Sequence, residues 1–454
     1  MKVKMRVWKK FLVAGATLAL VTGMASTLPS AYAGGTIKAD DDKWISIGMG
    51  MRMSFNGNEN GAPDGTSYDN NFTINNARIY INGQIHKYIK FTFNTECFNC
   101  ASNSGRFGGT NTFAGNSNIG LIDAIGKVEY NEKVNFWFGR TLVPTERGEL
   151  NGPFYHPTFD GFKTPFFPND QSANFGRSAA ANDGAGLYGR DNGVVFFGKL
   201  HPGGTHLLYV MSVFQGQNGG PNTGASLMYA GRLQWNLLND EMVDNPGYYT
   251  AGTYYGGVGD ILSLAFGFSH QKDGVGTALT KSDFNGIVFD GLFEKILPGN
   301  AGLLTINGEF KRFWANHRGS FTDGVLAGGT GETVPCGCTV AGTFSGNSPS
   351  PGMWTLNGNS WTVYALYMMP NNIGWGKFQP YGRFTRISPI DSSQREEWEA
   401  GMNYVISGFN ARVSAFWQYG DLATKGFVGG PGVFAPGRAG NRVDSFHVAL
   451  QLQY

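Results

Sequence analysis

The last stretch of the chain reads Asp444-Ser445-Phe446-His447-Val448-Ala449-Leu450-Gln451-Leu452-Gln453-Tyr454. It places an apolar side chain on every second position. In an extended strand such positions share one face, so an apolar stripe made by Phe446, Val448, Leu450, Leu452 and Tyr454 lies opposite Ser445, His447, Gln451 and Gln453. The stretch therefore predicts a β-strand with one polar and one apolar face, which suits either a soluble sandwich or a wall facing lipid.

The amino terminus indicates export. Lys2, Lys4, Arg6, Lys9 and Lys10 precede an apolar run over residues 11–21, and Ala31-Tyr32-Ala33 supplies a small-x-small cleavage site. We expect residues 1–33 to be a signal peptide and residues 34–454 to form one mature domain. The apolar run is shorter than the roughly 20 residues that a spanning helix needs. Any membrane residence of the mature chain must then use strands.

Composition and charge favour an exported β protein. The 454 residues include 68 glycines and 14% aromatic but only 15% charged side chains, so turn formers and strand formers are abundant. The whole chain carries 35 basic and 33 acidic side chains. Without residues 1–33, which hold five of the basic ones, the mature chain is slightly acidic. Nucleic-acid binding, which relies on a clustered basic surface, is therefore not expected.

Alternating segments recur along the whole mature chain. In residues 44–55, for example, Ile47, Met49 and Met51 share one face, while Ser46 and Arg52 lie on the other. The pattern predicts about sixteen strands, at residues 44–55, 77–85, 89–94, 119–130, 134–142, 192–200, 205–215, 226–237, 261–271, 284–295, 303–314, 361–369, 377–386, 397–406, 411–419 and 446–454. Polar residues opposite Ile and Met imply a polar interior. We therefore predict an all-β fold, a transmembrane antiparallel β-barrel in the outer membrane of a Gram-negative bacterium.

The connections support this interpretation. Even-numbered junctions are mostly short, whereas odd-numbered ones are mostly long, as at residues 56–71, 144–190, 315–360 and 420–442. Short turns at one rim and long loops at the other are typical of outer-membrane barrels. Residues 239–259 break the rule, because a turn is expected there and the stretch is long. Either that turn is elaborated around Tyr248, Tyr249, Tyr254 and Tyr255, or a hairpin is hidden and the barrel has eighteen strands.

Charges on the inward face are the candidate functional residues, because selectivity of a pore depends on the charges that line it. Strand parity points both acidic and basic side chains inward, although the parity of Arg140 is ambiguous. The pore-lining and constriction candidates are Arg52, Arg78, Lys127, Glu129, Arg140, Glu146, Arg147, Arg232, Glu309, Lys311, Arg383 and Arg412. The plain alternative for each is a charge solvated in a wide lumen with little effect on flux.

The longest loop, residues 144–190, follows the fifth predicted strand. Loops above roughly 15 residues in compact domains tend to be functional. We expect this loop to fold into the lumen and to act as the constriction, with Glu146 and Arg147 at its root as the preferred pair. An ion pair within the loop is the alternative interpretation of these two residues.

Four cysteines form two close pairs, Cys97 with Cys100 and Cys336 with Cys338, each on a predicted outer loop. In an exported chain such cysteines are expected to form disulfides. Their spacing leaves open whether each pair closes locally or the two loops are joined. Disulfide formation would leave no thiolates for a metal, and Cys100 precedes Ala101 rather than His, so the haem-attachment pattern is absent. The sequence thus predicts no metal site and no cofactor.

Several segments, in matching order and spacing, resemble the phosphate-selective porin O and P family over most of the mature chain. They are residues 76–83 (NARIYING), residues 123–130 followed by Phe138-Gly139-Arg140 and Pro144, and Gly189-Arg190-Asp191-Asn192-Gly193 with Val213-Phe214-Gln215-Gly216, the most specific match. The resemblance implies a sixteen-stranded, trimeric, passive channel. The chain departs from the family in its charge. The family members that concentrate phosphate use a dense ladder of arginines, whereas the inward face of this chain carries both acidic and basic side chains.

Three functional classes follow from these observations. The favoured one is a porin that lets small ions and solutes diffuse through a water-filled channel, with outer-membrane lipid around it and two further copies as partners. The second is a barrel that serves as a scaffold or sheath for a surface or electron-transfer partner. The third, a barrel-borne hydrolase, lacks support, since neither a Gly-x-Ser-x-Gly elbow nor a His-Glu-x-x-His helix occurs. The chain is therefore not expected to be an enzyme.

Overall fold

The computed structural model describes residues 34–40, 42–62, 64, 66–98, 118–161, 189–216, 224–241, 247–276, 281–315, 358–389, 394–421 and 442–454. These residues fold almost entirely into strands. The strands are β1 (Gly35–Lys38), β2 (Trp44–Asn58), β3 (Asp69–His86), β4 (Ile89–Phe98), β5 (Asn118–Glu129), β6 (Asn135–Leu142), β7 (Arg190–Leu200), β8 (His206–Phe214), β9 (Met228–Asn236), β10 (Ile261–Gly276), β11 (Lys281–Ile296), β12 (Leu303–Ala315), β13 (Gly358–Met368), β14 (Lys377–Pro389), β15 (Arg395–Ser407), β16 (Ala411–Gly420) and β17 (Val443–Gln453).

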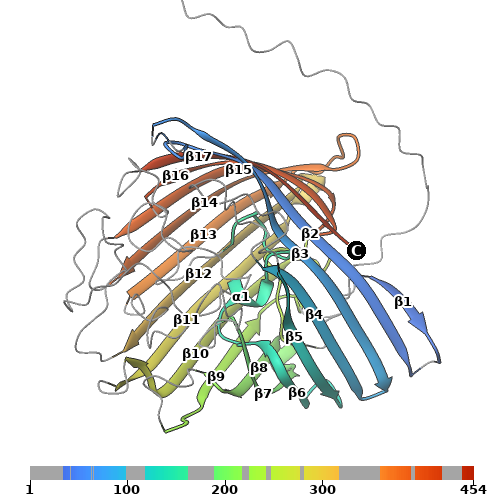
Figure 1. The fold of residues 1–454 in the computed structure, drawn as a ribbon. Coiled ribbons are helices and arrows are strands. Elements are labelled where there is room, and N and C mark those ends of the chain that lie inside the picture. Colours follow the sequence, from blue (N-terminus) through green and yellow to red (C-terminus); the bar gives the residue numbers. More distant parts are fainter. Residues whose placement is uncertain are drawn as a thin grey trace, which may run out of the picture.

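The sheet closes on itself as a barrel (Figure 1). Each strand from β2 to β17 pairs antiparallel with the next, and β17 pairs with β2 through contacts such as Leu450 opposite Met53. The short β1 pairs with β2 beyond the end of β17. The closed barrel of sixteen strands confirms the predicted fold class and excludes the eighteen-strand alternative.

Helical structure is sparse in the described residues. It comprises α1 (Arg147–Asn151) and two short 3-10 turns, Pro202–Gly204 and Pro298–Asn300. No helix in the part of the chain that the structure describes is long and apolar enough to cross a membrane.

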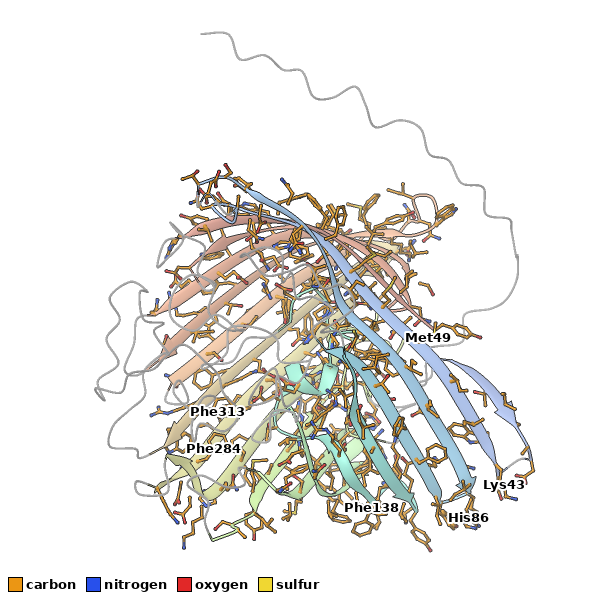
Figure 2. All side chains as sticks on the ribbon, in the orientation of Figure 1. Lys43, Met49, His86, Phe138, Phe284 and Phe313 are labelled. Atoms are coloured by element: carbon orange, nitrogen blue, oxygen red, sulfur yellow. The ribbon has the colours of Figure 1, made fainter. Side chains whose placement is uncertain are left out.

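Side chains alternate between a lipid-facing and a lumen-facing surface. On β2, Met49 is 64% exposed and Figure 2 shows it pointing away from the barrel, whereas Arg52 is 3% exposed. On β17, Phe446 and Leu452 face outward while Gln451 is buried. The apolar stripes seen in the sequence therefore form the outer surface. Closure satisfies the backbone hydrogen bonds of the wall, which lipid could not do.

The two rims differ as expected. Lys43 and His86 mark the rim of short turns in Figure 2, and Phe284 and Phe313 lie toward the opposite rim. The anomalous stretch after β9 is an elaborated turn, because its described parts, residues 237–241 and 247–260, contain no strand and return directly to β10. This turn folds into the barrel, where Tyr248 is fully buried.

Two details of the sequence interpretation were wrong. The second barrel strand, β3, begins at Asp69 rather than at residue 77, because a bulge at Asn75 shifts the register between Ile74 and Asn76 and interrupts the alternation. The interior is also not polar throughout. The wall formed by β6 to β9 turns apolar side chains inward, among them Trp137, Val195, Phe197, Leu208 and Val210.

Candidate functional site

The candidate site lies inside the barrel, where the chain after β6 folds back between the walls. Residues 143–161 contain α1, which Figure 1 shows within the outline of the barrel, and nearly all of their side chains are buried. We call residues 143–161 the inner segment. The rest of the loop, residues 162–188, lies outside the described residues, so the predicted constriction stays a prediction.

Arg147 attaches α1 to the wall formed by β9, β10 and β11. Its guanidinium donates hydrogen bonds to Glu241 at 2.7 and 3.0 Å, to Asp290 at 2.8 Å and to Ser263 at 3.1 Å. Arg232 on β9 donates to the same Asp290 at 2.5 and 2.8 Å. All four charged groups are fully buried. Because an unpaired buried charge is costly, this network holds α1 in one position.

The neighbouring residue Glu146 binds the β12 side of the same wall. Lys311 lies 2.5 Å from Glu146 and 2.9 Å from Glu309, and Glu309 also accepts a hydrogen bond from the backbone N–H of Gly148 at 2.9 Å. Burial raises the pKa of the Glu146 carboxyl, and the Lys311 ammonium offsets this only in part. The two carboxylates at Lys311 make the cluster acidic.

The second half of the inner segment runs along the opposite wall. Side chains of that wall donate to its backbone carbonyl groups. Arg412 donates to His156 O at 2.9 Å and Pro157 O at 3.1 Å, Arg383 to Gly161 O at 2.9 Å, and Arg52 to Phe159 O. Three arginines of the predicted pore lining thus bind neutral carbonyl oxygens of the loop.

Glycine on the wall lets the inner segment approach closely. A side chain at Gly267 on β10 would overlap the carbonyl group of Thr145, and one at Gly50 on β2 would lie 2.8 Å from the Phe154 ring. These two glycines come from opposite sides of the lumen. The segment therefore packs on both walls and crosses the bore.

The elaborated turn after β9 meets the inner segment from the short-turn rim. Thr250 donates to the Asn151 side chain at 2.7 Å, and the N–H of Gly252 donates to Tyr155 O at 2.8 Å. Tyr248 packs against Trp137 and Phe197, with ring centroids 5.1 and 5.4 Å away. This packing covers the apolar wall of β6 to β9 and accounts for its composition.

The remaining candidates lie elsewhere on the inner wall. Arg78 pairs with Glu96 at 2.5 Å. The Lys127 ammonium lies 4.0 Å from the centre of the Trp137 ring, and Glu129 pairs with Lys90 at 2.6 Å. Arg140 on β6 is half-buried and lies opposite Ala124 on β5.

Cys97 near the end of β4 is disulfide-bonded. Cys100, Cys336 and Cys338 lie outside the described residues, so the pairing pattern stays a prediction.

One group of carboxylates in the described part of the chain has the proximity of a metal site. Oxygen atoms of Asp160, Glu397 and Glu399 lie within 4.8 Å of one another. Arg383 reaches all three, at 3.9, 2.6 and 2.5 Å. The guanidinium already supplies the positive charge there, so we assign no metal to this group.

Sequence reasoning missed part of the network. Glu241 was not a candidate, although the anomalous length of its turn was a signal that the turn has a role. Asp290 faces inward by parity but was not among the site candidates. The pair Arg190 and Asp123, 2.5 Å apart, joins β7 to β5. Both residues lie in segments that carry the family resemblance, but their pairing was not predicted.

Comparisons with known proteins agree with the fold. No family model and no curated protein matches the sequence. Among solved structures, the anion-selective porin from Comamonas acidovorans is 13% identical over 91% of this chain and 100% of that chain, with a TM-score of 0.51. OprB from Pseudomonas putida is 11% identical over 90% of this chain and 94% of its own, with a TM-score of 0.49.

At this identity the likeness to the Comamonas porin shows the fold alone, a closed antiparallel β-barrel. The outer surface suits contact with membrane lipid, since apolar side chains such as Met49, Phe289 and Leu264 are at least half exposed on it. A cylinder with an apolar exterior and internally satisfied backbone belongs in a lipid bilayer. The chain is an outer-membrane β-barrel.

Proposed function

We propose that this barrel is a porin, a passive channel for small ions and solutes, with the inner segment as its constriction. The observation that carries the proposal is the crossing of the bore by residues 143–161, which bind charged side chains on both walls. A rigid, charged crossing of this kind narrows a wide lumen and biases which ions pass.

Single-channel recording in planar bilayers tests the proposal. Purified protein should give discrete open currents. Replacing residues 147–187 by a short Gly-Ser linker should raise the conductance several-fold, because it removes the segment that narrows the bore. Absence of any open current from both the full chain and the linker variant would reject the channel function.

A scaffold or sheath for a partner protein ranks second. The inner segment and the turn after β9 occupy volume that a threaded partner would need, and they contact each other through Thr250 and Asn151. Co-purification of a partner protein in a fixed ratio, with the open currents absent, would favour this alternative.

From the resemblance to the phosphate-selective porin O and P family we propose the passive channel but not the specificity for phosphate. Four of the inward arginines pair with carboxylates: Arg78 with Glu96, Arg147 and Arg232 with Asp290, and Arg383 with Glu399. Arg52 and Arg412 bind neutral carbonyl groups. The pairing with carboxylates lowers the positive potential that would concentrate an anion. Block of the current by phosphate at concentrations where chloride has no effect would contradict this.

We further propose that residues 1–33 are removed on export and that the mature barrel is a homotrimer. The composition of the amino terminus supports the first point. Amino-terminal sequencing of protein from the outer membrane should begin at Gly34, and its mass in detergent should correspond to three chains.

A further inference from the structure

Two histidines face each other at the short-turn rim of the barrel. His201 precedes the Pro202–Gly204 turn and His206 begins β8. Their Nδ1 atoms lie 2.8 Å apart, and the two rings are nearly perpendicular, at 83°. Alternate residues of β8 from Leu208 onward are buried in the lumen, so His206 takes an inward register position at the mouth of the bore.

The turn between them produces this pairing. Gly203 and Gly204 both adopt positive φ angles, 60° and 81°, which only glycine takes readily. The N–H of Thr205 donates to Pro202 O at 3.0 Å and closes the turn. The two imidazoles are therefore brought together by a rigid four-residue connection rather than by chance contact of long side chains.

A carboxylate from the neighbouring turn orients the first ring. Glu132 lies 2.6 Å from Nε2 of His201, and the backbone N–H of Lys199 donates to Glu132 O at 2.8 Å, which ties the two turns together. With Glu132 accepting the Nε2–H, Nδ1 of His201 presents its lone pair toward His206. A carboxylate that holds the outer N–H of a histidine is the usual support of a metal-ligating imidazole.

We propose that His201 and His206 bind a divalent transition-metal ion such as Zn²⁺ or Cu²⁺ through their Nδ1 atoms, with Glu132 as the positioning residue and water as the remaining ligands. Cu²⁺ prefers square-planar positions, in which two adjacent imidazole nitrogens lie about 2.9 Å apart, close to the observed 2.8 Å. Zn²⁺ binds imidazole nitrogens at about 2.0–2.1 Å in near-tetrahedral geometry, which needs the two nitrogens roughly 3.3 Å apart. A small rotation of one ring supplies that increase.

The site is accessible and distinct from the crossing of the lumen. The His201 and Glu132 side chains are 38% and 53% exposed, so an ion can enter without unfolding the barrel. Its place at the mouth would let it retain metal ions beside the channel. The two histidines are five residues apart in the sequence, but the sequence does not signal the support from Glu132, which lies 69 residues from His201.

Calorimetric titration of the tag-free, disulfide-intact barrel in detergent tests the proposal. Zn²⁺ and Cu²⁺ should each bind one per chain, whereas Mg²⁺ should give no heat. His206→Ala and His201→Ala should weaken binding at least tenfold, and Glu132→Gln by about 10–100-fold, the usual loss when a supporting carboxylate is removed. Electron paramagnetic resonance of the Cu²⁺ form should show two coordinated imidazoles.

His86→Ala is the matched control, since His86 is an exposed histidine at the same rim. It should leave the affinity unchanged. Equal weakening by His86→Ala and His206→Ala, or no saturable binding by the parent chain, would overturn the proposal and leave the pair as a hydrogen bond between imidazoles. Channel current is recorded separately, so this outcome is independent of the porin proposal.

Discussion

Arg147 joins three parts of the chain that are far apart in sequence: α1, the turn that carries Glu241, and β11 with Asp290. Arg147→Ala would leave Glu241 buried without its guanidinium partner. Breaking a buried pair in this way costs about 3–5 kcal/mol. We expect the free energy of unfolding in urea to fall by this amount and the single-channel current to become noisy as α1 loosens.

The control for Arg147 is Arg442→Ala, because Arg442 pairs with Glu396 at the rim with its side chain 46% exposed. An exposed pair contributes at most about 1 kcal/mol. Equal losses for the two variants would contradict the view that the network around Arg147 holds the inner segment.

Glu146 should make ion selectivity depend on pH. Its pKa is raised by burial, so the carboxyl gains its proton at a higher pH than an ordinary glutamate as the solution is acidified. Protonation removes one negative charge beside the bore, so the positive charge of Lys311 is then balanced by Glu309 alone. Reversal potentials across a salt gradient should therefore shift toward anion preference between pH 7.5 and pH 4.5.

Glu146→Gln should already show the more anion-preferring value at pH 7.5 and should lose the part of the pH response that belongs to this residue. Glu59→Gln is a suitable control, because Glu59 lies in the connection between β2 and β3 at the long-loop rim. A pH response that is identical in the parent and Glu146→Gln would show that another group titrates.

At the scale of the element, the close approach of the inner segment to β10 depends on Gly267. An added methyl group would overlap the carbonyl group of Thr145, so Gly267→Ala should push the segment off the wall and cost about 1–3 kcal/mol of stability. Gly308→Ala on β12 is the control, since its nearest neighbours would be 3.4 and 3.5 Å away. Urea unfolding and open-channel noise should change for Gly267→Ala alone.

The strands could be predicted because their signal is local. Alternation within β2 and β17 is visible in a window of a few residues, and such alternation located the other barrel strands except β6, which was located from a run of apolar residues without clean alternation. The start of β3 was missed because the bulge at Asn75 shifts the phase of the pattern. The docking of α1 could not be predicted, since the partners of Arg147 lie 94 and 143 residues away in the sequence.

The molecule as a whole differs from the wide, evenly polar cylinder that strand parity suggests. The wall that carries Phe197 and Leu208 is apolar inside because the turn with Tyr248 covers it, and parity alone does not reveal what fills a bore. The opposite wall is polar where Arg412 binds the loop backbone. The types of side chain that face inward therefore depend on the loops and turns that fill the lumen as well as on the solutes that pass through it.

The lipid-facing surface gives the last prediction. Val448 lies in the middle of β17 and is 40% exposed on the outer face, whereas His447 beside it faces inward and contacts Asn56 at 2.7 Å. An arginine on the lipid face near the middle of the bilayer costs about 2–4 kcal/mol. Val448→Arg should therefore reduce the folded fraction in phospholipid vesicles, measured by the heat-dependent mobility of the barrel in gels. His447→Arg adds the same charge to the lumen and should fold nearly as well as the parent chain. Equal folding of the two variants would contradict the assignment of inner and outer faces.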